Sequence, residues 1–136
     1  MSNLEQTLSI IKPDAVERNL QDEIKQEFKN KGFEIIKEKK IQIEKSEAEK
    51  FYKVHETKPF YNDLCDYLSS GPIVVMILQK ENAVKENREL MGARNPKDAD
   101  DGTIRKKYGI SIDKNSVHGS DSIENARIEI DFFFRD

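Results

Sequence analysis

The chain has 136 residues, 36 % of them hydrophobic and 36 % charged, which suits one compact globular domain and is short for two. Its 23 basic and 26 acidic side chains leave a net charge of −3, so general nucleic-acid binding is not expected and any positive site must be local. The single cysteine, Cys65, excludes an intrachain disulfide and favours a reducing compartment.

Targeting and membrane-spanning segments are not expected. The N-terminal sequence MSNLEQTLSIIKPD lacks the basic stretch and apolar run of a signal peptide. The longest strongly apolar run, residues 73–78, is far too short to cross a bilayer. No repeat, low-complexity tract or linker divides the sequence, so we expect residues 1–136 to form a single domain of a cytoplasmic protein.

The first elements expected along the chain are a strand and a helix. Residues 7–11 (TLSII) form a short β-prone run that ends at a proline. Leu20, Ile24 and Phe28 then recur at four-residue spacing and form one apolar stripe of a helix. Gly32 suits the position just after that helix, where a left-handed backbone conformation lets the chain fold back on its last turn.

A second strand and a second helix are expected next. Residues 33–43 mix β-branched residues with lysines and predict a long, partly exposed strand. Residues 46–49 (SEAE) match a capping box, which predicts a helix that begins there and carries Phe51, Tyr52 and His55. On such a helix we expect His55 to be packed or exposed rather than catalytic.

The remaining elements point to a mixed fold. Phe60 opens a further helix, and residues 73–78 (IVVMIL) predict a strand that is covered on both faces. A helix over 81–91, a loop with one short helical turn over 92–115, a short strand and a helix over 123–134 complete the chain. This order favours an α+β or α/β sandwich, and a four-stranded βαββαβ arrangement is the simplest form.

The segment NSVHGSDS places His118 among small polar residues, where a core histidine would have apolar neighbours. Residues 121–124 (DSIE) resemble a second capping box, so Asp121 is expected to start a helix whose N-terminal amides lie near the imidazole and attract a phosphate group. Gly119 is expected to remove a side-chain obstacle beside the ring. A histidine with the unperturbed pKa of about 6.5 is largely neutral at pH 7, so a ring of this kind can act as a nucleophile. An ordinary loop histidine in a capped turn is an equally open interpretation.

Basic side chains cluster in the segment before this histidine. They are Arg88, Arg94, Lys97, Arg105, Lys106 and Lys107. Arginines on a loop are well shaped to clamp phosphate oxygens, whereas the interleaved acidic residues favour a solvated surface. Because neither GxxxxGK[ST] nor GxGxxG occurs, a phosphate site in this chain must be built from side chains.

The octapeptide NSVHGSDS resembles the NxxHGSDS active-site signature of the nucleoside diphosphate kinases, and this match is highly specific. Further motifs match the same family in order and spacing along the whole chain. They are IKPD (11–14), KPF (58–60), SGP (70–72), Arg88 with MGA (91–93), NP (95–96), GTIR (102–105) and EI (129–130). The resemblance implies a ferredoxin-like βαββαβ sandwich, in which helices pack on a four-stranded antiparallel sheet.

The resemblance also implies ping-pong transfer of the γ-phosphoryl group from a nucleoside triphosphate such as ATP to a nucleoside diphosphate, which yields CTP, GTP, UTP and dNTPs. His118 would be the nucleophile, phosphorylated on Nδ1, while Glu129 orients its ring and Ser120 hydrogen-bonds that carboxylate. The nucleotide-binding residues that it implies are Lys12, Tyr52, Phe60, Arg88, Arg94, Arg105, Ile112 and Asn115.

Each of these nucleotide-binding positions carries an implied role. Arg88 and Arg105 match phosphate contacts. Positions near the sugar and phosphates are matched by Lys12, Tyr52 and Asn115. Phe60 matches the aromatic side chain that stacks on the base, with Ile112 as the apolar side chain opposite it. Because every base has a π-face, such a clamp implies broad base specificity.

Magnesium is the cofactor that the resemblance implies, held mainly by nucleotide phosphates and water rather than by protein ligands. The implied partners are nucleoside di- and triphosphates and further copies of this chain. Those copies would form a homo-oligomer built from dimers, with a hexamer favoured over a tetramer. Membranes and nucleic acids are not expected as partners.

Two positions depart from the family pattern. Arg94 stands where the family usually has a threonine whose hydroxyl contacts phosphate, and Asp101 stands where it commonly has proline. Arg94 keeps hydrogen-bond donors and adds a charge but is bulkier, so it would strengthen the phosphate clamp, crowd it or point to solvent. The favoured hypothesis is an active kinase. The alternatives are a nucleotide-binding regulatory oligomer with weak catalysis and a nucleic-acid-binding module that uses the basic loop.

Overall fold

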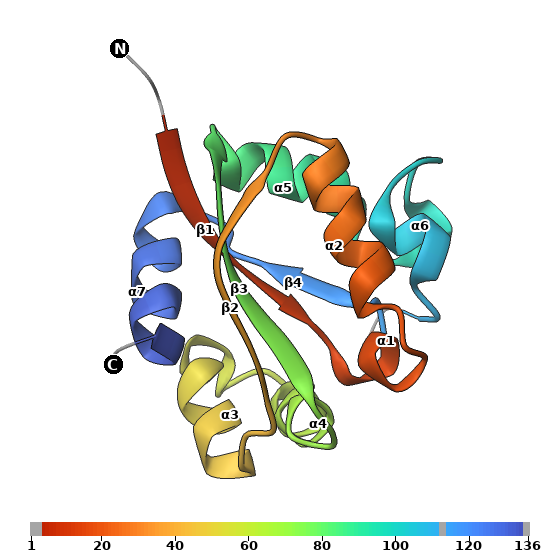
Figure 1. Cartoon of the computed structure of the whole chain (residues 1–136). Coiled ribbons are helices and arrows are strands. Elements are labelled where there is room, and N and C mark those ends of the chain that lie inside the picture. Colours follow the sequence, from red (N-terminus) through yellow and green to blue (C-terminus); the bar gives the residue numbers. More distant parts are fainter. Residues whose placement is uncertain (1–3, 112–113, 135–136) are drawn as a thin grey trace.

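A four-stranded sheet forms the centre of the protein, and the computed structural model describes residues 4–111 and 114–134 (Figure 1). In chain order the elements are β1 (Leu4–Ile11), α1 (Pro13–Glu17), α2 (Gln21–Asn30), β2 (Glu34–Ile41), α3 (Lys45–Phe51), η1 (Lys53–His55), α4 (Tyr61–Leu68), β3 (Ile73–Glu81), α5 (Ala83–Met91), η2 (Pro96–Asp98), α6 (Ile104–Tyr108), β4 (Val117–Gly119) and α7 (Ile123–Phe134). The strand order is β2-β3-β1-β4, and every neighbouring pair is antiparallel. The expected ferredoxin-like sandwich is therefore confirmed.

Ile112 lies outside the described residues, and its expected place opposite the base stays a prediction.

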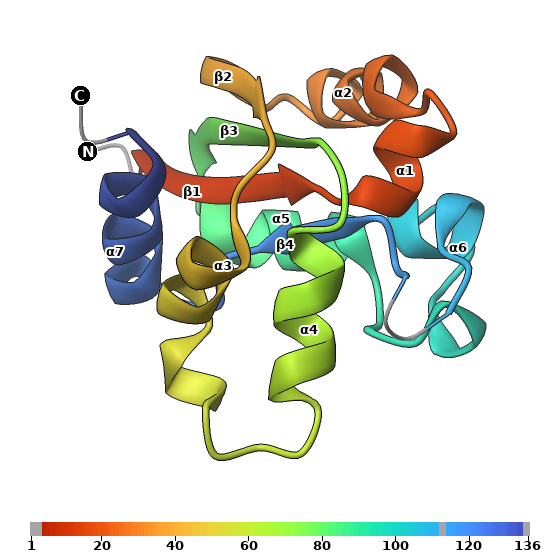
Figure 2. The same cartoon turned by 90° about the horizontal axis from the view of Figure 1, so that it is seen from below.

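The two central strands carry the core on both of their faces. Val74, Met76 and Leu78 of β3 pack into a cluster with α1, α2, α5 and α6, whereas Ile73 and Val75 pack with α3, α4 and α7. Figure 2 shows α1 and α2 on one side of the strands and α3 and α4 on the other. This confirms the strand expected to be covered on both faces. Each such side chain contributes about 1.5–3 kcal/mol on burial.

The short strand β4 determines where His118 lies. It pairs with the end of β1 at the edge of the sheet, with His118 opposite Ile10 and Gly119 opposite Ser9. His118 is therefore part of a strand and not of a free loop, so its backbone is fixed by the sheet. No helix within the described part of the chain combines the length and the apolar character that a bilayer crossing requires.

The helix expected around Phe51 begins earlier and ends sooner than the sequence pattern predicted. Glu44, not Ser46, is its N-cap. In the capping box the Glu44 side chain accepts the Glu47 amide, and the Glu47 carboxylate accepts the Glu44 amide at 3.4 Å. A carboxylate accepts the orphan amide hydrogen bond as a hydroxyl does, so the earlier pair of acidic residues caps the helix. The helix ends at Phe51, and a 3₁₀ turn carries His55. His55 therefore does not share a helical face with Phe51.

The capping box expected at residues 121–124 is wrong by one residue. The Ser122 hydroxyl accepts the Asn125 amide hydrogen bond at 3.0 Å, so Ser122 rather than Asp121 caps the helix that begins at Ile123. Serine accepts this bond as well as aspartate does, and the local sequence alone does not decide between neighbours. Asp121 is left to line the cleft beside His118.

Gly32 ends α2 in the way the sequence predicted. Its φ of +86° is left-handed, its amide donates to the Lys29 carbonyl, and the Phe33 amide donates to the Phe28 carbonyl, both at 3.0 Å. The rings of Phe28 and Phe33 then meet edge to face with centroids 5.8 Å apart. This is a Schellman motif with its apolar contact, and it aligns β2 for pairing with β3.

Replacing Gly32 with alanine should lower the free energy of unfolding by about 1–2 kcal/mol, because a side chain disfavours the left-handed conformation. Urea unfolding at fixed protein concentration measures this change. Gly71→Ala is the matched control, since Gly71 lacks a positive φ and an added β-carbon would lie 3.6 Å from Pro13 Cβ, an ordinary contact. Equal losses in both variants would contradict the conformational explanation.

Candidate active site

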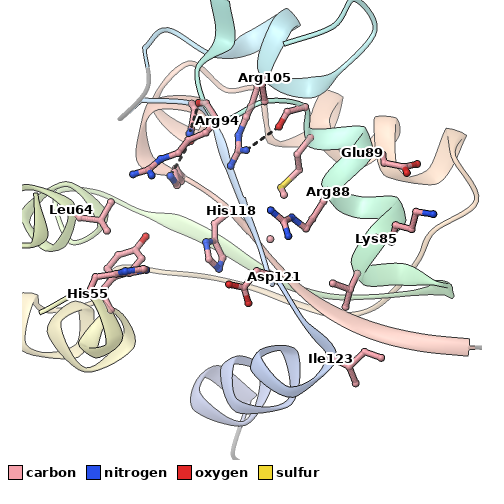
Figure 3. A pocket seen from close by; sticks show the side chains of 18 of the residues that line it. His55, Leu64, Lys85, Arg88, Glu89, Arg94, Arg105, His118, Asp121 and Ile123 are labelled. Carbon is pink, nitrogen blue, oxygen red and sulfur yellow. Dashed lines mark hydrogen bonds between the residues drawn. The ribbon is translucent and has the colours of Figure 1, made fainter. Parts of the chain in front are cut away.

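A cleft of about 810 Å³ opens beside β4, between α5 and the segment from Tyr52 to Leu64 (Figure 3). It gathers side chains from widely separated parts of the sequence. The residues expected from the sequence that line it are Lys12, Tyr52, Phe60, Arg88, Arg94, Arg105, Asn115 and His118. Ser120 and Glu129, also expected, contact one another, and Glu129 reaches the cleft through His118. The remaining expected residue, Ile112, lies outside the described residues.

Glu129 connects His118 to the sheet and to α7. Its Oε1 lies 3.1 Å from His118 Nε2 and accepts a 2.8 Å hydrogen bond from the Ser120 hydroxyl. Ser120 is fully buried, and its amide donates to the Leu8 carbonyl at 3.2 Å. Its hydroxyl oxygen also accepts the Leu8 amide at 3.2 Å. The carboxylate therefore holds the imidazole against a rigid part of β1.

This contact determines the tautomer of the imidazole. A carboxylate oxygen only accepts hydrogen bonds, so His118 Nε2 must carry the hydrogen that faces Glu129 Oε1. In the neutral ring the lone pair then lies on Nδ1. The arrangement therefore offers a nucleophilic or basic nitrogen in a cleft, with a partner that stabilises positive charge on the ring.

Aromatic side chains fix the plane of the His118 ring. Phe51 meets it edge to face with centroids 5.3 Å apart, and Tyr52 does so at 6.5 Å. Tyr52 is buried, and this burial, followed by the negative charge of Glu129, raises the pKa of its phenol. The Tyr52 hydroxyl therefore stays protonated and remains a hydrogen-bond donor at neutral pH.

Gly119 has a different role from the expected one. An added β-carbon would overlap the Asn87 side chain and lie 2.8 Å from Met91 Cε, both on α5. The missing side chain therefore lets α5 pack closely against β4, rather than clearing the approach to the imidazole. Because α5 carries Arg88, this packing brings Arg88 and His118 to the same cleft.

Lys12 and Asn115 form a connected pair at one wall of the cleft. Lys12 Nζ donates to Asn115 Oδ1 at 2.9 Å, and Asn115 Nδ2 donates to the Arg94 carbonyl at 3.0 Å. The Lys12 amide donates to the Ser116 carbonyl at 2.8 Å. Ser116 is itself held by a 3.1 Å hydrogen bond to Asp14. Because Lys12 and Asn115 are both buried, their polar ends are fixed before any ligand arrives.

Three arginines give the cleft a local positive charge that the net charge of the chain conceals. Arg105 donates to the carbonyls of Gly92 at 3.1 Å and Val117 at 2.9 Å. Burial, together with the positive charges of Arg94 and Arg88, lowers its pKa to about 10. None of the three guanidinium groups pairs with a carboxylate within the described residues. Guanidinium groups without a carboxylate partner can bind an anion, and phosphate oxygens suit their geometry.

Phe60 forms the opposite end of the cleft and is surrounded by polar groups. Arg94 Cζ lies 5.3 Å and Lys58 Nζ 5.6 Å from the ring centroid. The ring of His55 lies 6.0 Å from Phe60 and 6.2 Å from Tyr52, centroid to centroid. His55, expected to be packed or exposed, therefore lines the cleft.

Sequence reasoning missed other members of the cleft wall besides His55. They include Lys58, Leu64, Met91 and Asp121. The KPF motif that contains Lys58 was the available signal, but a helical register drawn through Phe51 obscured the position of His55. Burial first, and then the positive charges of Lys58 and Arg94, lower the pKa of His55, which favours the neutral form of its ring.

Metal-binding groups are not concentrated in this part of the protein. Within residues 4–111 and 114–134 there is no group of three or more His, Cys, Asp or Glu side chains placed to hold a metal ion. The carboxylates on the cleft wall, Glu5, Glu89 and Asp121, come from separate elements. A metal ion would need further oxygen ligands there, and a polyphosphate can supply them.

Comparisons with known proteins agree with this geometry. The family model described as nucleoside diphosphate kinase matches residues 5–136. The nucleoside diphosphate kinase of Nitratiruptor sp. is 58 % identical over 131 residues, covering 96 % of each chain. That of Geobacter sulfurreducens is 55 % identical over 131 residues, again with 96 % of each chain covered. The crystal structure of the Aquifex aeolicus nucleoside diphosphate kinase superposes with a TM-score of 0.95 at 38 % identity and covers 96 % of this chain and 95 % of that one. The chain therefore belongs to the nucleoside diphosphate kinase family and is a phosphotransferase that acts on nucleotides.

Proposed function

We propose that His118 carries the phosphoryl group between nucleotides in a ping-pong reaction, from a nucleoside triphosphate such as ATP to any nucleoside diphosphate. The observation that carries this proposal is the 3.1 Å contact between His118 Nε2 and Glu129 Oε1, beside a cluster of arginines without carboxylate partners. The contact with Glu129 places the lone pair of His118 on Nδ1. The arginine cluster favours a phosphate group next to that nitrogen.

The chemical step follows from this tautomer. The Nδ1 lone pair of His118 attacks the γ-phosphorus, and the bond to the bridging oxygen breaks, so the nucleoside diphosphate leaves with that electron pair. The ring becomes positive as the N–P bond forms, and Glu129 stabilises this charge through Nε2–H. A second nucleoside diphosphate then attacks the phosphorus by the reverse path and restores the free imidazole.

The cations of the cleft are proposed to bind and orient the phosphates. Arg105 and Arg88 contact the transferring phosphoryl group and its neighbours, because charge spreads over the phosphoryl oxygens in the transition state. Lys12, held by Asn115, adds a point charge at the same wall. Fixed donors need no reorganisation during the reaction, so they favour the transition state over the ground state.

The base is proposed to bind at Phe60, with the sugar near Tyr52. An aromatic ring stacks on every base, and no side chain of the described cleft is required to read base edges in this arrangement. Broad base specificity follows, which suits an enzyme that supplies CTP, GTP, UTP and dNTPs. Ile112 is proposed as the apolar side chain on the other face of the base.

Magnesium is proposed as the cofactor, and it would supply positive charge that neutralises the polyphosphate. Asp121, on the cleft wall beside His118, is a carboxylate that could contact such an ion through water. Lys12 and the arginines contact the remaining phosphate oxygens, so protein cations and metal share the neutralisation of the polyphosphate.

The same proposal takes residues 1–136 as one domain of a cytoplasmic enzyme and as the subunit of a homo-oligomer built from dimers, a hexamer rather than a tetramer. Ile36 on the edge strand β2 and Ile128 on α7 are exposed apolar side chains, 36 % and 61 % accessible, that such an assembly would cover. Sedimentation of the purified protein measures the number of subunits directly.

His118→Asn should abolish the phosphoenzyme. After mixing with radiolabelled ATP and magnesium, wild-type protein should carry an acid-labile, base-stable label that nucleoside diphosphates remove, because phosphohistidine has this stability. His55→Asn is the matched variant, since His55 is the other histidine of the chain and lines the same cleft. It should still be labelled. A His118→Asn protein that is labelled and turns over at the wild-type rate would refute the mechanism.

Glu129→Gln should lower kcat roughly 10- to 100-fold with little change in KM, because a charge-assisted hydrogen bond to the developing positive ring is lost. Steady-state kinetics with two nucleoside diphosphates measure this effect. Glu124→Gln removes a carboxylate from the exposed face of the same helix and should leave kcat unchanged. If both variants slow the enzyme equally, Glu129 acts only through its negative charge and not by orienting the His118 ring.

A further inference from the structure

Arg94 spans the cleft from one wall to the other. Its carbonyl accepts the hydrogen bond from Asn115 that ties this backbone to Lys12, at the wall proposed to bind phosphate. Its guanidinium lies over Phe60, with Cζ 5.3 Å from the ring centroid. In Figure 3 the side chain accordingly extends toward the side of the cleft where Leu64 lies. The threonine usual at this position is too short to make this contact.

The guanidinium of Arg94 is held there only weakly. Among the described residues it has no carboxylate partner, and the side chain is exposed. A cation over an aromatic ring at an exposed site favours the contact by only about two- to fivefold. Its positive charge also lowers the pKa of the nearby Arg105, so the two guanidinium groups repel each other while the cleft is empty.

The surface that Arg94 covers is the one proposed for the base. The Phe60 ring has cations over it from two residues, Arg94 and Lys58. A base that stacks on the face that Arg94 covers must displace the guanidinium, because both cannot occupy one face together. Once displaced, Arg94 stays anchored through its backbone to Asn115 and Lys12, next to the phosphate wall. A guanidinium fork binds phosphate oxygens with two parallel hydrogen bonds, and the phosphate charge relieves its repulsion with Arg105.

We propose that Arg94 is a specificity-determining residue, which covers the stacking face of Phe60 in the empty cleft and turns to the phosphates when a nucleotide binds. This inference rests on the proposed role of Phe60 as the base platform. If Arg94 acts in this way, more of the affinity for a nucleotide comes from its phosphates and less from its base. A nucleoside has to displace Arg94 and gains nothing from it, whereas a polyphosphate gains a further cation. The chain should therefore select for phosphates more strongly than for the base.

Arg94→Thr should have opposite effects on two partial ligands. Adenosine should bind roughly two- to fivefold more tightly, since it no longer has to break the contact with Phe60. Magnesium pyrophosphate should bind roughly two- to fivefold more weakly. Loss of a charge-assisted hydrogen bond to phosphate lowers the affinity about tenfold, which outweighs the gain from no longer having to break the contact of Arg94 with Phe60. NMR titration of the full-length oligomer follows both ligands, including the weakly bound nucleoside.

The matched control is Lys97→Thr, which removes one positive charge from the exposed surface of the same loop without touching the cleft. It should change neither affinity. If adenosine binds Arg94→Thr no more tightly than wild type, Arg94 does not cover Phe60. If pyrophosphate binds it equally well, the guanidinium does not turn to phosphate. If Lys97→Thr changes both affinities as much as Arg94→Thr does, the changes come from the net charge of the protein and not from the position of Arg94.

Two further measurements separate this inference from the proposed function. Phe60→Ala should weaken adenosine binding, and if it does not, the proposed base site is wrong whatever Arg94 does. In the ligand-free protein, the pKa of His55 is lowered by burial, Lys58, Arg94 and His118 and raised by Asp121. Arg94→Thr should therefore raise the His55 pKa in an NMR titration, and an unchanged pKa would place the guanidinium away from Phe60.

Discussion

The carboxylate of Glu129 is the constraint on which the rest of the site depends. It accepts hydrogen bonds from His118 and Ser120 at once, and Ser120 is locked by two hydrogen bonds to Leu8 in β1. One side chain of α7 thereby joins the edge strand, the central strand and the imidazole. The tautomer of the ring, with its lone pair on Nδ1, follows from this one junction, because a carboxylate cannot donate a hydrogen bond. Phe51 and Tyr52 then fix the plane of the ring.

Electrostatic imbalance is the second organising feature of the cleft. The chain as a whole carries a charge of −3, yet Arg88, Arg94 and Arg105 gather where no carboxylate pairs with them within the described residues. Burial of Arg105 makes this arrangement costly in the empty protein, which is the cause of its lowered pKa. The phosphates of the proposed nucleotide ligand would remove the repulsion among these arginines, because they bring negative charge to the cluster.

Most of the architecture was predictable from local patterns, and the errors have clear causes. The doubly covered β3, the amphipathic α2 and the turn at Gly32 depend on periodicity and on backbone geometry, which the sequence encodes directly. Helix starts were less predictable, because several neighbouring polar residues cap equally well, and Glu44 and Ser122 proved to be the caps. His55 was misplaced because a 3₁₀ turn interrupts the helical register drawn through Phe51.

The sequence by itself determined the family, the fold and the residue types of the site, since NSVHGSDS and the accompanying motifs occur in family order. Only the tertiary structure decided how these residues meet, because contacts between distant segments depend on packing and not on local pattern. It showed that Gly119 serves the packing of α5 against β4. It also placed the guanidinium of Arg94 over the Phe60 ring, a contact that none of the three alternatives drawn from the sequence included, because the two side chains meet only once both walls of the cleft are folded.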